Sequence, residues 1–191
     1  MLTDMKPIEY FKEMVATAVK HQRIRTCETT EFYLSSLLTD FTSSEKLGAE
    51  PLCITYLKAL ESDRSMQGRL LKDLGDISLF TSGFFSDSLK RKIVDMDYYI
   101  SMGASAYASL AAMHKDERGA ALMAGLFAEL SDKFKIFVDV LAEVSEITSL
   151  TSSKDVLRVY ERWLRTKSKR AEKTLRALGI KPLEVSTQTL H

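Results

Sequence analysis

The chain has 191 residues, a length typical of one globular domain. A hydrophobic content of 45% and a charged content of 28% exclude a chain that is disordered throughout. The 27 basic and 26 acidic residues nearly cancel, so net charge alone indicates no class of partner. With only eight glycines and three prolines, the chain is neither fibrous nor linker-like, and long uninterrupted elements are favoured.

The expected location follows from segments that the sequence lacks. The first residues carry charges throughout and have no apolar core of the kind found in secretory signal peptides. No stretch approaches the roughly twenty apolar residues of a transmembrane helix. Cys27 and Cys53 are isolated, as is typical of free thiols in a reducing compartment. We therefore expect a cytoplasmic protein without a transmembrane segment.

Apolar residues recur at helical spacing through the first part of the chain. Pro7 suits the first turn of a helix, and Pro51 can open a short helix. Either Asp63 or Ser62 can cap the helix that follows. The period loosens near residues 21–26, where one helix should end and the next begin. The predicted helices cover residues 7–21, 28–41, 51–60, 64–85 and 95–113.

The second part of the chain predicts two longer helices. A long periodic segment begins at residue 116, and its residues from Leu122 to Thr148 step by three or four, which indicates one long central helix. Either Gly119 and Gly125 break this helix near its start, or the bundle is elongated. A basic helix should follow over 153–178, ending at Gly179. No long alternation of period two appears. We therefore predict an all-α bundle of six or seven helices in one domain, residues 1–179, with a loose tail at 180–191.

Sequence patterns typical of enzymes and metal proteins are missing. No phosphate-binding glycine loop and no hydrolase elbow occurs, and no glutamate has a histidine three residues later as a di-metal bundle requires. Three histidines supply a zinc site poorly. We accordingly assign no catalytic residue, metal or cofactor, and we favour a function other than catalysis.

Small residues gather in two segments that are expected to be helical. Gly75 and Gly83 lie in the first, residues 74–85, and Gly103 lies in the second, residues 101–109. A glycine inside a helix costs about 1 kcal/mol relative to alanine, so a compensating contact is expected. Close packing of the two segments against each other would provide it.

Polar residues near these segments allow two interpretations. Arg69 and Asp76 share a helix face at the entrance to the apolar stretch, and Tyr98 and Tyr99 could lie opposite. The first interpretation is a structural ion pair with tyrosine hydroxyls at the edge of the core. The second is a pocket for a small ligand near Gly75–Gly83 and Gly103. Its candidate ligand-binding residues are Arg69, Asp76, Ser82, Tyr98 and Tyr99.

The same region resembles a known family. The pattern LGD-x-SLF-x-SGFF from Leu74 to Phe85, followed by Tyr98-Tyr99 and Gly103, is similar to that of an uncharacterised bacterial all-helical family. The resemblance spans most of the chain and implies a cytoplasmic bacterial helical protein. It implies no activity and transfers no functional residue.

Basic residues concentrate in the predicted C-terminal helix. Residues 154–181 contain ten basic and three acidic residues. At 100° per residue, seven of the cations fall on one arc beside the apolar face, which predicts a stripe for an anionic partner. The alternative is a solvated face relieved by ion pairs within the helix, and nucleic acid is the less favoured partner because no base-reading pattern accompanies the stripe. The stripe consists of Lys154, Arg158, Arg162, Arg165, Lys169, Lys173 and Arg176.

These observations favour a structural or interaction protein. Eight methionines and apolar residues on several helix faces suggest more apolar surface than one bundle can bury, and homodimers are the commonest closed assembly. We therefore expect a partner-binding helical homodimer. The alternative function is binding of a small ligand in the pocket described above.

Overall fold

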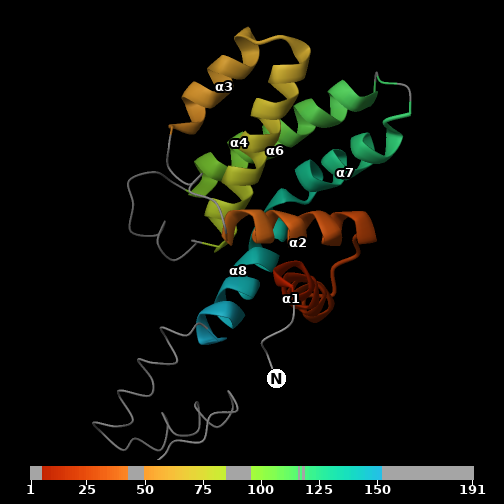
Figure 1. The fold of residues 1–191 in the computed structure, drawn as a ribbon, viewed down its shortest axis with the longest axis vertical. Coiled ribbons are helices and arrows are strands. Elements are labelled where there is room, and N and C mark those ends of the chain that lie inside the picture. Colours follow the sequence, from red (N-terminus) through yellow and green to blue (C-terminus); the bar gives the residue numbers. More distant parts are fainter. Residues whose placement is uncertain (1–5, 43–49, 85–95, 116, 118, 152–191) are drawn as a thin grey trace, which may run out of the picture. The chain divides into compact units, whose positions relative to one another are not determined.

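The computed structural model describes residues 6–42, 50–84, 96–115, 117 and 119–151. Within this part of the chain there is no strand, which confirms the prediction of an all-α fold. The chain divides into two units, Met1–Ser145 and Glu146–His191, and the description below concerns the first. The described helices (Figure 1) are α1 (Pro7–His21), α2 (Glu28–Thr42), α3 (Leu52–Glu61), α4 (Arg64–Phe84), α6 (Met96–Lys115), α7 (Ala121–Asp132) and α8 (Phe134–Thr151).

Local sequence accounts for several helix starts. Pro7 occupies the first turn of α1, where its missing N–H removes no hydrogen bond. The Asp63 carboxylate accepts hydrogen bonds from the backbone N–H groups of Ser65 and Met66, both at 3.0 Å, and so caps α4. Pro51 is the N-cap residue of α3. The cap of α4 and both proline positions agree with the predictions from sequence.

The prediction of one long central helix over residues 116–148 is wrong. The segment forms two helices, α7 and α8, which are separated at Lys133. Lys133 leaves the helical conformation, with φ −105° and ψ 19°. Its ammonium donates to the carbonyl of Arg25 at 2.6 Å and to Glu129 at 2.8 Å. The break therefore lies where a side chain is tied to the α1–α2 connection. Gly119 (φ +85°) precedes α7, and Gly125 lies within it without interrupting it.

Three helices, α4, α6 and α7, lie side by side with α6 between the other two (Figure 1). α3 packs on α4, and α1 packs on α2. α2 contacts both α4 and α7, so it connects the α1–α2 pair to the three-helix layer. This arrangement brings residues distant in sequence onto the middle of α4, where the candidate site lies.

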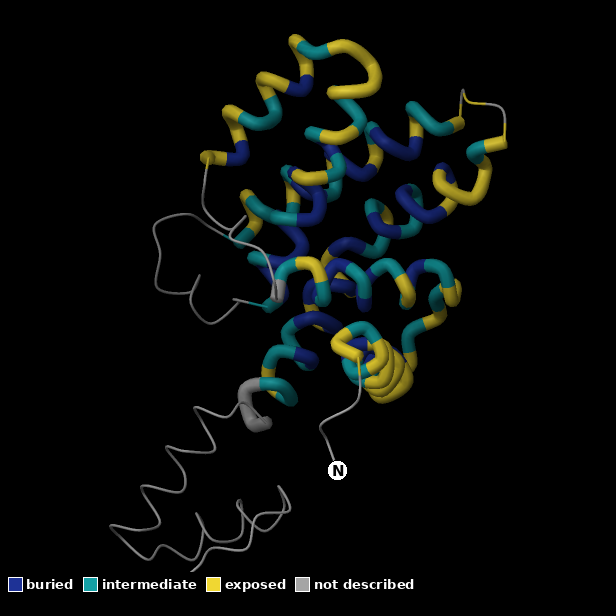
Figure 2. The backbone as a smooth tube through the Cα atoms, viewed as in Figure 1, coloured by how far each residue is buried: buried dark blue, intermediate teal, exposed yellow. Residues whose placement is uncertain are grey.

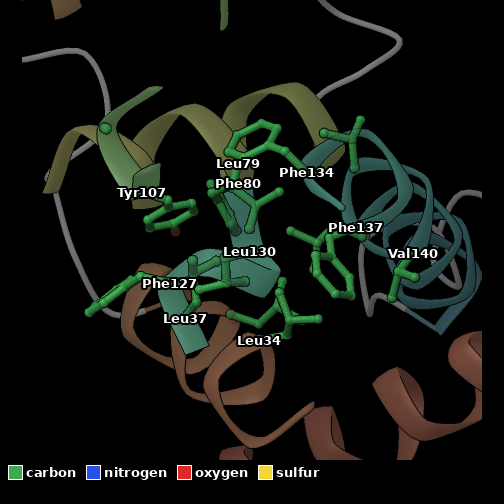
Figure 3. Packing of buried hydrophobic residues seen from close by; sticks show 14 of the residues in the cluster. Leu34, Leu37, Leu79, Phe80, Tyr107, Phe127, Leu130, Phe134, Phe137 and Val140 are labelled. Atoms are coloured by element: carbon green, nitrogen blue, oxygen red, sulfur yellow. The ribbon is translucent and has the colours of Figure 1, made fainter. Parts of the chain in front are cut away.

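Apolar side chains from all seven described helices form the core, and Figure 3 shows part of it. The most deeply buried part of the tube runs through the middle of the first unit (Figure 2). Phe134 and Phe137 of α8 lie in this cluster beside Leu130 of α7. Other members of the cluster are Leu34 and Leu37 of α2, Leu79 and Phe80 of α4, Tyr107 of α6 and Phe127 of α7.

Close packing at the glycines positions the core helices. A Cβ atom on Gly75 would lie 2.5 Å from the ring of Tyr107, and one on Gly103 would lie 2.3 Å from the ring of Phe134 and 2.7 Å from the Cβ of Ser78. All three distances are shorter than real carbon contacts. The expected approach of the two small-residue segments is therefore present, and core side chains occupy the space that the glycines leave open.

Two features predicted from sequence lie outside the described residues. They are the basic C-terminal helix over 153–178 and the tail at 180–191.

A matched pair of alanine substitutions tests the packing at these glycines. We expect Gly103→Ala to lower the free energy of unfolding by about 1–3 kcal/mol, because the added methyl overpacks the Phe134 ring. Gly125→Ala should raise it by about 0.5–1 kcal/mol, since no atom lies within 4 Å of the added Cβ and alanine favours the helix. Chemical denaturation of both variants measures the difference. Equal effects of the two substitutions would contradict this packing.

Candidate functional site

A buried carboxylate lies in the middle of α4. Asp76 is only 7% exposed. One of its oxygens accepts hydrogen bonds from the Tyr33 hydroxyl at 2.5 Å and the Tyr107 hydroxyl at 2.7 Å. The other accepts from the Lys72 ammonium at 2.5 Å, one helical turn earlier. We call these four residues the Asp76 cluster.

The residues of the cluster come from α2, α4 and α6. Their burial determines the direction in which their pKa values shift. Desolvation raises the pKa of Asp76, against the opposing effect of the Lys72 charge and the two tyrosine donors. Burial and the nearby Asp76 charge raise the pKa values of Tyr33 and Tyr107 far above the usual range. Both phenols therefore keep their protons at neutral pH and serve as donors. The Lys72 ammonium also lies 5.3 Å from the centre of the Tyr33 ring.

The cluster explains how a charged group is accommodated in the core. Each carboxylate oxygen has a donor, so the desolvation penalty is offset by charge-assisted hydrogen bonds. The arrangement ties three helices together at one point. The first interpretation made from sequence, an ion pair with tyrosine hydroxyls, named Arg69, Tyr98 and Tyr99. The observed partners of Asp76 are instead Lys72, Tyr33 and Tyr107.

The residues predicted from sequence as ligand-binding are not brought together. Asp76 is in the cluster, whereas Arg69 is exposed and makes no contact with it. The Ser82 hydroxyl donates to the Ser78 carbonyl at 2.7 Å within α4. Tyr98 lies beside the Cys53 thiol of α3; burial and that thiol raise its pKa. Tyr99 packs at the edge of the core.

Sequence reasoning missed Lys72, Tyr33 and Tyr107. The Lys72–Asp76 pair has the i,i+4 spacing of a helical ion pair, and this spacing could have identified it. Nothing in the sequence links Tyr33 or Tyr107 to Asp76, because these contacts depend on how α2 and α6 pack on α4.

An open pocket of about 340 Å³ adjoins the cluster, with lining residues from α4, α6, α7 and the α6–α7 connection. Lys72 belongs to both the pocket and the cluster. Gly68 leaves the pocket open, since a Cβ there would meet only the end of the Met113 side chain at 3.7 Å. The lining residues are Arg64, Ser65, Gly68, Arg69, Lys72, Leu110, Met113, His114, Glu117, Met123 and Phe127.

A second carboxylate connects α7 to α2. Glu129 accepts hydrogen bonds from the Thr30 hydroxyl at 2.6 Å and from Lys133 at 2.8 Å. Partial desolvation acts upward on its pKa, but the hydrogen bonds prevail and lower the pKa to about 2. Glu129 is therefore ionised at all physiological pH values and has a structural role at the α7–α8 break.

α3 carries large apolar side chains on two sides. Leu52 and Ala59 are buried against the rest of the unit. Ile54, Leu57 and Leu60, spaced three residues apart, are 40%, 54% and 56% exposed. α3 is coloured largely as exposed in Figure 2. We call Ile54, Leu57 and Leu60 the α3 stripe.

The described residues contain no group of three or more histidine, cysteine, aspartate or glutamate side chains placed to hold a metal ion. Cys27 and Cys53 are exposed free thiols. His21, at the end of α1, lies 2.9 Å from Glu143. None of the described helices has the length and apolar character needed to cross a bilayer.

Comparisons with known proteins give no indication of function, so function is inferred from the residues of this chain. No family model matches the chain, and searches of curated proteins and of solved structures find no match.

Two lysine substitutions test whether Lys72 compensates a buried charge. We expect Lys72→Met to lower the free energy of unfolding at pH 7 by about 1–2 kcal/mol, a value reduced because the Lys72 side chain is 44% exposed. Lys58→Met breaks the solvent-exposed pair with Glu50 and should cost much less stability.

The pH dependence of the Lys72→Met effect has a defined sign. Without Lys72 the pKa of buried Asp76 is raised further, so the folded state binds its proton more tightly than the unfolded chain. The stability lost by the variant should therefore be largest at neutral pH and should shrink as pH falls toward the ordinary range of an aspartate. Urea denaturation from pH 4 to pH 7 measures this. A loss that is independent of pH would show that Asp76 is not charged in the folded protein.

Proposed function

We propose that this chain is a helical interaction module that forms a homodimer through the α3 stripe. The observation that carries the proposal is the double-sided apolar character of α3. One side of α3 is buried and α3 packs against α4. Its other side exposes three large aliphatic residues in one row. Single exposed apolar residues are common on protein surfaces, whereas an aligned row on one short helix is typical of a contact surface.

A second copy of the same chain is the proposed partner because the stripe is symmetric about its centre. In an antiparallel pair of α3 helices, Leu57 meets its own counterpart at the two-fold axis, and Ile54 meets Leu60 at both ends. This is the isologous contact that a two-fold dimer requires. Lys58 and Glu61 of the same helix add one charge of each sign, so like charges do not dominate the surface around the stripe.

A charge introduced at the centre of the stripe tests the dimer. We expect the wild type to be a dimer at about 50 μM and Leu57→Glu to be a folded monomer, because each dimer would place two carboxylates against each other at the axis. Leu122→Glu is the matched control: Leu122 is 67% exposed but lies on α7. Sedimentation equilibrium measures the mass, and circular dichroism checks folding.

The location of the axis is tested separately. Leu57→Cys in a chain with Cys27→Ser and Cys53→Ser should form an intermolecular disulfide under mild oxidation, whereas Leu122→Cys in the same background should not. A monomeric wild type refutes the proposal. A dimer that persists in Leu57→Glu and dissociates in Leu122→Glu places the interface on α7 instead.

A second candidate function rests on charge alone. The ten basic and three acidic residues of 154–181 favour binding of an anionic partner through the basic stripe. This is compatible with a dimer, since two copies would double the number of cations.

Charge reversal tests the basic stripe. We expect the wild type to bind an anionic surface at low salt and to lose that binding at high salt. Arg158→Glu, Arg165→Glu and Lys169→Glu together should abolish it. Binding is measured on anionic vesicles, with duplex DNA in parallel. If the wild type binds neither at low salt, or if the triple variant binds as the wild type does, the stripe is only a solubilising face.

A further inference from the structure

The pocket beside the Asp76 cluster has an excess of positive charge. Arg64, Arg69 and Lys72 contribute three cations to its lining, against the single carboxylate of Glu117. An anion entering the pocket therefore meets a favourable field on entry.

Two of these cations already have partners. Lys72 is paired with Asp76. The Arg64 guanidinium donates to the Met113 carbonyl at 2.6 Å and lies 3.6 Å from Glu117. Arg69 has no hydrogen bond or ion pair with any residue that the structure describes. It is thus the cation in the pocket whose five donors are open to a ligand.

The remaining lining is apolar and partly aromatic. Leu110 and Phe127 are buried, and the Phe127 ring stacks against the His114 ring with 5.6 Å between their centres. Met113 and Met123 add adaptable thioether side chains. A wall of this kind recognises a hydrophobic body by shape and burial, while a few polar groups fix its orientation.

We propose that this pocket binds a small organic anion, whose charged headgroup pairs with Arg69 and whose apolar body lies against Leu110, Met123 and Phe127. A volume of about 340 Å³ is at the small end for ligand pockets, which limits the ligand to a compact molecule such as an aromatic carboxylate, sulfonate or phosphate ester. The site is separate from the α3 stripe, and it differs from the predicted pocket at the glycines, which core side chains fill.

Two probes that differ by one charge test the proposal. The first is 8-anilinonaphthalene-1-sulfonate, and the second is N-phenyl-1-naphthylamine, which has the same ring body without the sulfonate. We expect the sulfonate probe to bind the wild type saturably at one site per chain, measured by fluorescence and calorimetry. Arg69→Gln should weaken its binding at least fivefold and change that of the neutral probe less than twofold.

Two further variants complete the experiment. Arg25→Gln removes an exposed cation that does not line the pocket and should leave the binding of both probes unchanged. Gly68→Leu should weaken both probes, because the added side chain fills the pocket where only Met113 lies near. Circular dichroism and thermal unfolding establish that each variant is folded.

The outcomes separate this site from the proposed dimer. Leu57→Glu should bind the sulfonate probe as the wild type does, so failure of the dimer leaves this proposal intact. Three results would overturn it: no saturable binding of the sulfonate probe to the wild type, equal losses in Arg69→Gln and Arg25→Gln, or unchanged binding in Gly68→Leu.

Discussion

The contact between Tyr107 and Gly75 is the constraint on which the middle of this fold depends. The tyrosine ring lies where any other residue at position 75 would place its Cβ, so only glycine lets α6 approach α4 this closely. That approach brings the Tyr107 hydroxyl to 2.7 Å from Asp76. The missing side chain and the buried carboxylate are therefore parts of one arrangement. The helical cost of the glycine is offset by a hydrogen bond that a looser packing could not form.

The Asp76 cluster also determines what the neighbouring pocket can do. Both oxygens of Asp76 already accept hydrogen bonds within the fold, from Tyr33, Tyr107 and Lys72, and Asp76 does not line the pocket. Lys72 is anchored by the same contacts and lends its charge to the pocket wall. A side chain that has all its hydrogen-bond partners within the fold stabilises the packing and contributes to the electrostatic field in the pocket. The open bonding capacity lies at Arg69, one turn from Lys72 and about two turns from Asp76.

Sequence predicted the helical elements well because their boundaries are encoded locally. Proline at positions 7 and 51 and the Asp63 cap act within a few residues, and the ends of α1, α2, α3 and α4 fall within about two residues of the predicted positions. The break at Lys133 was missed because neither glycine nor proline marks it. Both α7 and α8 continue the same apolar period, and the interruption coincides with a hydrogen bond from the Lys133 side chain to a carbonyl 108 residues away, which no local pattern indicates.

The candidate site was predictable only in part, for the same reason. Asp76 was identified because a carboxylate in an apolar stretch is unusual in any sequence, but its tyrosine partners come from other helices. Arg69 was expected beside Asp76, since both lie on one helix and share a face in projection. In the structure Lys72, one turn from Asp76, pairs with the carboxylate, whereas Arg69 lies about two turns away.

The contrast between satisfied and unsatisfied groups is the strongest guide to function in this chain. Ser82, Asp76 and Glu129 attract notice as polar residues at buried or half-buried positions, yet each has its hydrogen bonds within the fold. Buried polar groups of this kind specify packing. The α3 stripe and Arg69 are ordinary in sequence but incomplete in the structure, one lacking an apolar partner and the other an anion among the described residues. Contacts with other molecules form at such incomplete surfaces, so the α3 stripe and Arg69 are where this chain is expected to bind its partners.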